Sequence, residues 1–81
     1  MRITEAKNKI RIRMKMIRVE QNWSIEDMCK VTGDKPSSLK NKLCGISNFT
    51  LDDVLAIADT TNKSLDYVCG RSESPKIFTE Q

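Results

Sequence analysis

Histidine is absent from the 81-residue sequence. Its absence removes the most common general base, the most common zinc ligand and every Ser-His or Cys-His catalytic pair. Long apolar runs are also lacking, because the longest covers only the five residues 54–58. Such a run is too short for a secretory signal or a membrane span. We therefore expect no membrane segment, no bound metal or cofactor, and no simple enzyme.

Cysteine pairs are lacking as well. Cys29, Cys44 and Cys69 form an odd set without a C-x-x-C spacing, whereas a small secreted domain usually has an even number. This pattern favours a reducing cytoplasm. Cys29 and Cys69 are predicted to be small packing residues. Cys44 is either a redox switch or a plain small residue, and the second is favoured because only lysines nearby would activate its thiol.

The length of the chain limits it to one domain. A chain of 81 residues buries only about 60% of its unfolded surface, which suits a few short helices or a small sheet. Hydrophobic residues make up 38% of the sequence and charged residues 31%. The apolar residues fall in periodic clusters, so extensive disorder is not expected.

Basic residues are concentrated in two separate segments. Residues 1–22 carry seven bases and two acids, and residues 35–45 carry three lysines and no acid. Residues 23–34 and 46–70 are acidic, with net charges of −2 and −3, although the whole chain has a net charge of +3. If folding joins the two basic segments, they form a patch suited to a polyanion. Otherwise they are ordinary solvated lysines and arginines.

The first segment is predicted to form a helix over residues 4–20. Residues 10–16 alternate apolar and basic side chains like a half-buried strand, but a helix explains more of the apolar positions, and methionine and lysine favour it. Ile12, Met16 and Val19 then form a second apolar stripe. That stripe is either a wider core face or an exposed contact for a partner. The main helical stripe consists of Ile3, Ala6, Ile10, Met14 and Ile17.

A second helix is predicted from Ile25 to about Thr32. Ser24 is a good N-cap residue, and Asp27 stands three residues later as in a capping box. Gly33 can end the helix in the left-handed conformation. Trp23 is expected to pack against this helix, since that is more common than a role in stacking on bases.

A third helix is predicted over residues 36–44. Lys35 precedes a proline and is therefore pushed towards the extended backbone that an N-cap residue needs. Pro36 is tolerated at the first helical position, and Gly45 can end the helix.

Two further helices are predicted after residue 50. Thr50 and Asp53 repeat the capping-box spacing, and Asn62 can close the fourth helix in the left-handed conformation. Ser64 can cap a short fifth helix that ends at Gly70. The residues expected to line one face of the fourth helix are Leu51, Val54, Leu55 and Ala58.

Positions throughout these five segments carry a resemblance to a known family. They are Ile10, Met14, Ile17, Arg18, Ser24, Met28, Cys29, Gly33, Leu39, Gly45, Leu51, Val54, Leu55, Ile57, Ala58 and residues 64–70. Residues 10–71 resemble, without a gap, the helix-turn-helix domains of the phage repressor and Cro family, also called the xenobiotic-response-element family. The resemblance implies an all-α, five-helix, lambda-repressor-like domain over residues 1–71. Residues 72–81 are predicted to be a C-terminal tail whose apolar residues are Ile77 and Phe78.

The sequence departs from the family pattern at several positions. The family usually begins its second helix with a glutamine that bonds a DNA phosphate, and this chain has Ile25 there. The family arginine that matches Arg18 often pairs with an acid, but the corresponding position here is Leu43. Thr61 and Lys63 stand where the family usually buries Leu and Val, which predicts weaker packing of the fifth helix.

The third helix is the candidate DNA-contacting element. If Leu39 and Leu43 face the core, the 100° step per residue places Asn41 on the opposite face, with Lys40 and Lys42 on its flanks. Asparagine can form two hydrogen bonds with adenine, and lysines on the flanks can contact phosphates. Asn41 can equally be a plain surface amide. The predicted DNA-binding residues are Lys35, Ser37, Ser38, Lys40, Asn41 and Lys42.

The leading hypothesis is a sequence-specific transcriptional regulator that binds double-stranded DNA as a homodimer. The family resemblance implies the dimer, and two half-sites about 34 Å apart give discrimination that one small domain lacks. The alternative is a protein-interaction module of the same fold, such as an antitoxin or inhibitor, with the partner bound through Ile12, Met16 and Val19 or through the tail. Catalysis by Asp52 and Asp53 is the least favoured reading, because first-turn acids usually cap the helix and complement its dipole.

Overall fold

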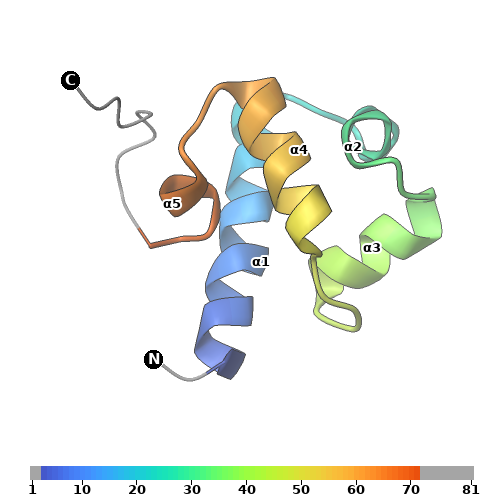
Figure 1. Ribbon diagram of the computed structural model, residues 1–81. Helices are drawn as coiled ribbons and strands as arrows, with labels where there is room; N and C mark the ends of the chain where they lie inside the picture. Colours follow the sequence, from blue (N-terminus) through green and yellow to red (C-terminus); the bar gives the residue numbers. More distant parts are fainter. Residues whose placement is uncertain (1–2, 72–81) are drawn as a thin grey trace.

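Helix α1 is the longest element in the computed structural model, which describes residues 3–71. Four shorter helices follow it, and the described residues contain no strand (Figure 1). The prediction of an all-α, five-helix domain is therefore confirmed. The helices are α1 (Ile3–Glu20), α2 (Ile25–Thr32), α3 (Pro36–Cys44), α4 (Leu51–Thr61) and α5 (Leu65–Val68).

Two of the helices start at complete capping boxes. Ser24 Oγ accepts a hydrogen bond from the Asp27 N–H at 3.1 Å, and Asp27 Oδ2 accepts one from the Ser24 N–H at 3.0 Å. Thr50 and Asp53 repeat this arrangement at the start of α4, with distances of 3.1 and 3.0 Å. These reciprocal bonds satisfy N–H groups that a helix otherwise leaves without partners. Both helix starts follow the sequence prediction.

Left-handed residues end three helices, as predicted. Gly33 and Gly45 follow α2 and α3 with φ values of 81° and 87°, and Asn62 follows α4 with φ 56°. A side chain larger than glycine is strained at such φ values, although asparagine tolerates them. The short loops therefore turn where the glycine and asparagine positions allow it.

The core lies where α1 packs against α3 and α5, and where α2 packs against α3 and α4 (Figure 1). The largest side chains in it are fully buried, and Cys29 is buried among them as a small packing residue, as predicted. Trp23 and Phe49 pack against the edge of this core, which supports the packing role predicted for Trp23. The fully buried large side chains are Met14, Ile17, Met28, Leu39, Ile57 and Val68.

The predicted inner face of α4 is wrong in part. Val54 and Ala58 are buried, but Leu51 is 70% exposed and Leu55 is also exposed. Ile57 takes their place in the core. Helices α2 and α5 both pack against α4, and the spacing of α4 alone does not specify which of its sides they cover.

The second apolar stripe of α1 is exposed. Ile12, Met16 and Val19 have exposed fractions of 51%, 43% and 71%. They therefore do not widen the core within the described chain. This leaves the second possibility raised by the sequence, a surface that can contact another molecule.

Helix α5 is held by contacts around its tyrosine, despite the two unusual residues before it. The Tyr67 ring is buried, with the Arg13 guanidinium 4.1 Å and the Lys63 ammonium 5.2 Å from its centre. The Tyr67 hydroxyl donates to Glu20 Oε2 at 3.1 Å. Lys63 thus contributes to the packing of α5 through a cation–π contact in place of an aliphatic side chain.

Two further predictions from the sequence concern the C-terminal tail and membrane-spanning helices. The predicted tail of residues 72–81, with Ile77 and Phe78, lies outside the described residues. Within residues 3–71, no helix combines the length and the apolar character needed to cross a membrane.

Candidate nucleic-acid interface

Helices α2 and α3 pack together across a three-residue connection, residues 33–35. The connection begins at Gly33, whose N–H donates to the Cys29 carbonyl at 2.7 Å and closes the end of α2. Lys35 adopts an extended backbone, with ψ 154°, and precedes Pro36 at the start of α3. The glycine and the proline therefore act at the two ends of the turn, as the sequence indicated.

Helix α3 has one buried face and one exposed polar face. Leu39 is fully buried and Leu43 almost so, which fixes the helix against the core. Ser37, Ser38 and Asn41 are exposed on the outside of α3. The predicted orientation of α3 is confirmed by this burial pattern. The exposed face carries hydroxyl and amide groups that can both donate and accept hydrogen bonds.

The N-terminal end of α3 is exposed and has no side-chain cap. Lys35 occupies the N-cap position and forms no capping hydrogen bond through its side chain. Both Lys35 and Lys40 are exposed, so their ammonium groups face solvent beside the polar face. A helix start with a cation and uncapped N–H groups can bind a phosphate.

Lys42 occupies a different environment from the other two lysines. Its Nζ donates to Asp53 Oδ2 at 2.6 Å and to both carboxylate oxygens of Asp34 at 3.0 Å. Only 12% of the Lys42 side chain is exposed, and only 4% of the Asp53 side chain. The same Asp53 oxygen accepts the capping hydrogen bond from the Thr50 N–H. Lys42 therefore joins α3 to the start of α4 and to the connection before α3.

The two carboxylates hold Lys42 in its charged form. Burial alone would lower the pKa of Lys42, but the hydrogen bonds to Asp53 and Asp34 outweigh this effect and raise its pKa above the ordinary value. Because this one ammonium is paired with two carboxylates, the cluster as a whole carries no positive charge to attract a phosphate. The sequence prediction for Lys42 therefore needs correction, because a helical wheel places Lys42 on a flank of α3 but cannot show the two approaching carboxylates.

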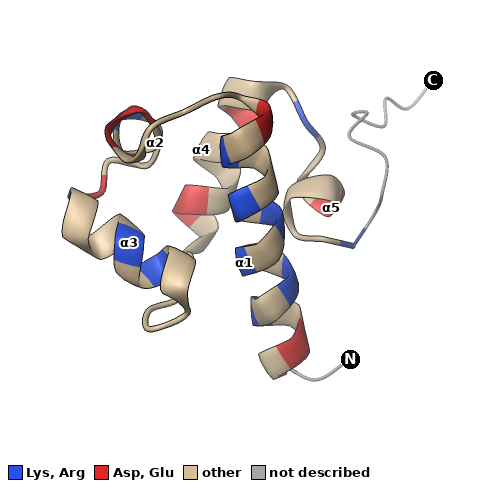
Figure 2. Ribbon diagram, turned by 180° about the vertical axis from the view of Figure 1, so that it is seen from behind, with Lys and Arg blue, Asp and Glu red and all other residues tan. Residues whose placement is uncertain are grey.

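The two basic segments of the sequence come together in the fold. Figure 2 shows Lys and Arg positions along much of α1 and on α3, whereas acidic positions lie on α2 and at the start of α4. Helix α1 packs directly against α3, which brings the segments into contact. The two basic segments are therefore neighbours in the fold, although Arg13 lies against the Tyr67 ring, Arg18 is bonded to the Trp23 carbonyl, and Lys42 is paired with Asp34 and Asp53.

Ile25, which departs from the family pattern, and Arg18, whose usual acidic partner is replaced by Leu43, both have structural roles. Ile25 is half-buried and packs against the core, as an apolar residue at that position should. Arg18 Nη1 donates to the Trp23 carbonyl at 3.0 Å, and this bond ties the end of α1 to the residues before α2. The Arg18 Nε is buried, and no hydrogen-bond partner for it lies within the described chain.

The three cysteines are free thiols. Burial raises the pKa of Cys29 and of Cys69 above the ordinary thiol value, so neither is an activated thiolate. Cys44 is exposed at the end of α3, on the same side as Asn41, where it can contact whatever α3 binds.

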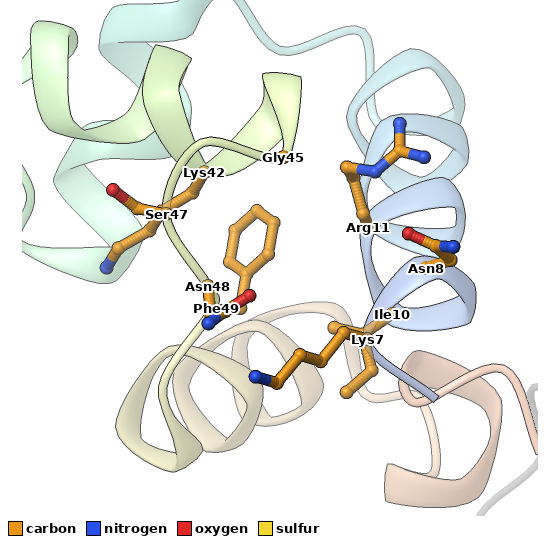
Figure 3. A pocket seen from close by; sticks show the side chains of 9 residues that line it. All are labelled: Lys7, Asn8, Ile10, Arg11, Lys42, Gly45, Ser47, Asn48 and Phe49. Atoms are coloured by element: carbon orange, nitrogen blue, oxygen red, sulfur yellow. The ribbon is translucent and has the colours of Figure 1, made fainter. Parts of the chain in front are cut away.

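Residues 7–11 and the loop after α3 form a hollow that sequence analysis missed. Lys7 and Arg11 of α1 line it together with Ser47 and Asn48 of the loop (Figure 3). The excess of basic residues in the first segment was the available signal. The excess alone does not show which of the basic side chains lie beside the loop after α3, because that depends on how α1 packs against α3.

The comparisons with known proteins do not assign a family to the chain. No protein-family model, curated protein or solved structure matches it at a significant level.

Proposed function

We propose that this protein binds double-stranded DNA and regulates transcription, with α3 placed in the major groove. The observation that carries this proposal is the exposed face of α3. It presents Ser37, Ser38 and Asn41 between Lys35 and Lys40, while the opposite face is anchored in the core. Helix α3 contains no acidic residue that would repel a polyanion. An α-helix fits the major groove, where hydroxyl and amide side chains can contact base edges.

The roles of the individual residues follow from their positions on α3. Asn41 can bond the edge of an adenine, and Ser37 and Ser38 can donate to or accept from a base or phosphate. Lys35 and Lys40 are the phosphate contacts at the sides of the groove. Lys42 is excluded from the contacts because its ammonium is bound to Asp34 and Asp53. The packing of α2 and α3 across a turn that contains Gly33 supports a helix-turn-helix unit.

The binding unit that suits this site is a homodimer. One α3 helix contacts only a few base pairs, and each wrong base pair changes the binding free energy by about 1–3 kcal/mol. Two copies on half-sites about 34 Å apart multiply that discrimination. The preferred DNA site would then be a palindrome.

Selection from random duplexes tests the proposal directly. The purified protein is mixed with a duplex library at low salt, and the bound fraction is amplified and sequenced over several rounds. Enrichment of a palindrome is expected. Binding without any enriched sequence would contradict sequence-specific regulation, and no binding even at 50 mM salt would contradict a DNA-binding function altogether.

A second candidate function is a protein-interaction module, such as an antitoxin or an inhibitor. The observation that favours it is the exposed stripe of Ile12, Met16 and Val19 on α1. Apolar side chains at helical spacing suit an interface with another protein. The duplex selection separates the two candidate functions, because a protein-interaction module is not expected to enrich any particular duplex sequence.

A further inference from the structure

Two adjacent hollows lie along the exposed apolar stripe of α1. The first is about 190 Å³ in volume, and Lys9, Ile12, Met16 and Gly70 are among the residues that line it. The second continues along the helix from Met16 to Val19. The three apolar side chains of the stripe are between 43% and 71% exposed. Pockets for small-molecule ligands usually exceed about 300 Å³, so the first hollow suits one apolar side chain instead.

The last described residues lie beside the first hollow. A Cβ atom added to Gly70 would lie 2.9 Å from the Cβ of Lys9 and 3.1 Å from its carbonyl oxygen, so the backbone of Gly70 lies directly against α1. Gly70 also has a φ of 76°, and glycine meets both conditions without strain. The Arg71 N–H donates to the Asp66 carbonyl at 2.8 Å, which fixes the backbone at this point. The chain beyond Arg71 therefore continues from a fixed point beside the stripe.

Residues 72–81 contain one pair of large apolar side chains, Ile77 and Phe78. Ile77 is six residues beyond Arg71 in the sequence, and an extended chain spans that separation with about 20 Å. Helix α1 rises about 15 Å between the first hollow and the end of the stripe, at about 1.5 Å per residue. The apolar pair can therefore reach any part of the stripe while the described helices keep their positions.

Charge favours this stripe over the other exposed apolar surface, which lies around Leu55 and Leu65. Three bases and one acid line the two hollows of the stripe, so their charges sum to +2. Two acids and one base line the surface around Leu55 and Leu65, which gives a sum of −1. Residues 72–81 carry two glutamates and one lysine and therefore have a net charge of −1. A segment of this charge is attracted to the stripe and repelled by the other surface.

The size of the stripe favours a short segment of the same chain over a second protein. Each partner of a stable protein–protein interface buries about 800 Å². Three partly exposed side chains on one helix, Ile12, Met16 and Val19, are too few to bury that area. A segment that is joined to the same domain needs less contact area, because a short tether gives it an effective concentration in the mM range.

We propose that Ile77 and Phe78 dock on the α1 stripe of their own chain, with the Phe78 ring against Met16. A methionine side chain adapts its shape to a neighbouring aromatic ring, and its sulfur contacts the ring favourably. The docked pair closes the exposed apolar face of α1. A protein partner that binds the stripe would first have to displace it. This proposal is independent of DNA binding, since it involves no residue of α3.

Nuclear Overhauser effects in the intact protein test the contact directly. Cross-peaks are expected between the Phe78 ring protons and the methyl groups of Ile12 and Met16. They should keep their relative strength when the protein is diluted, and a mixture of labelled and unlabelled chains should show none between different chains. Cross-peaks between chains would overturn the proposal and identify a second copy as the occupant of the stripe. Absence of any cross-peak from Phe78 to α1 would overturn it as well.

Protection of Met16 from oxidation gives a second measurement. Dilute hydrogen peroxide converts accessible methionines to sulfoxides, and mass spectrometry of peptides gives the rate at each site. The double variant Ile77→Ser, Phe78→Ser should raise the rate at Met16 about threefold or more, because a tethered contact of this kind is closed in most molecules. Phe78→Leu keeps an apolar side chain and should keep most of the protection. The rates at the fully buried Met14 and Met28 should not change in either variant.

Leu51→Ser is the matched control for the oxidation experiment. It removes an exposed apolar side chain of α4 that lines neither hollow of the stripe, so the rate at Met16 should stay the same. An equal increase in Leu51→Ser and in the double variant would overturn the proposal, because it would show a general loss of stability. An unchanged rate at Met16 in the double variant would also overturn it. These outcomes leave the DNA-binding proposal intact, since that proposal is tested by the duplex selection.

Discussion

Helices α2 and α4 begin with complete capping boxes, whereas α3 begins at Lys35 without a side-chain cap. In each of these two helices the two capping residues stand three positions apart, so the start of the helix is specified locally. Helix α3 is instead held by distant partners. Leu39 and Leu43 enter the core, and Lys42 binds carboxylates eight and eleven residues away. Its position is therefore a property of the whole fold.

This difference has a consequence for the candidate interface. The start of α3 has no side-chain cap, and the polar side chains of its outer face are exposed. A helix whose position is fixed by its inner face can bind a ligand on its outer face without moving.

The largest expected effect follows from removal of the Lys42 ammonium. Lys42→Met leaves the almost fully buried Asp53 carboxylate and its neighbour Asp34 without a cation. Removal of one partner from a buried ion pair costs about 3–5 kcal/mol. We expect a decrease of that size in the free energy of unfolding, measured by urea denaturation. Lys40→Met is the matched control, and a change within about 0.5 kcal/mol is expected there.

Equal stabilities of the Lys42→Met and Lys40→Met proteins would show that the position of α3 does not depend on the ion pairs. Helix α3 would then differ from α2 and α4 only in the absence of a cap.

The next effect concerns the apolar anchor of α3. Leu39 is fully buried, and replacement of such a leucine by alanine costs about 2–5 kcal/mol. Leu39→Ala should reduce the unfolding free energy by this amount in the same denaturation experiment. Leu51→Ala on the exposed side of α4 is the control and should have little effect. A Leu39 effect below about 0.5 kcal/mol would mean that the burial of α3 is assigned to the wrong face.

The contrast between local and distant contacts also explains what the sequence could predict. The starts of α2 and α4 and the ends of α2 and α3 were predicted correctly, because capping residues and glycines act on their own segments. The exposure of Leu51 and the ion pairs of Lys42 were not predicted, since both depend on which helices pack beside them. For the candidate site, five of the six predicted residues are exposed, and the sixth, Lys42, is neutralised.

A smaller effect is expected on DNA binding. Asn41→Ala removes a side chain of the exposed face without touching the core. If Asn41 bonds a base edge, affinity for the selected DNA site should fall by about 1–3 kcal/mol while affinity for random duplex stays the same. Anisotropy titrations on the two duplexes measure both quantities.

Lys40→Ala should behave in the opposite way in those titrations. Loss of a phosphate contact weakens binding to both duplexes equally and reduces the salt slope by about one. If Asn41→Ala weakened both duplexes and Lys40→Ala changed base preference, the outer face of α3 would be rotated relative to the assignment given above.

The helix caps provide a further prediction. Thr50→Ala removes the side-chain acceptor at the start of α4, and loss of such an N-cap typically costs about 1 kcal/mol. Lys35→Ala changes the N-cap residue of α3 but breaks no capping bond, so its effect on the unfolding free energy should be smaller. A larger effect at Lys35 than at Thr50 would contradict the distinction between capped and uncapped helices.

The smallest effect is expected from the acid titration of the α2 cap. The Ser24 backbone N–H donates to the Asp27 carboxylate, and this bond, with the Ser24 hydroxyl, lowers the pKa of Asp27 below its ordinary value of 3.8. A carboxyl group with a lowered folded-state pKa contributes stability above pH 3.8, and the contribution disappears as pH falls through the lower value.

Asp27→Asn keeps an acceptor oxygen but cannot titrate. Urea denaturation at several pH values should therefore show the wild type losing stability relative to Asp27→Asn only below about pH 4. Because Asp27 is fully exposed, solvent screens the interaction and the difference should be small. A difference that stayed constant down to pH 2 would show that the charged carboxylate does not contribute to the start of α2, and that α2 depends on its packing as α3 does.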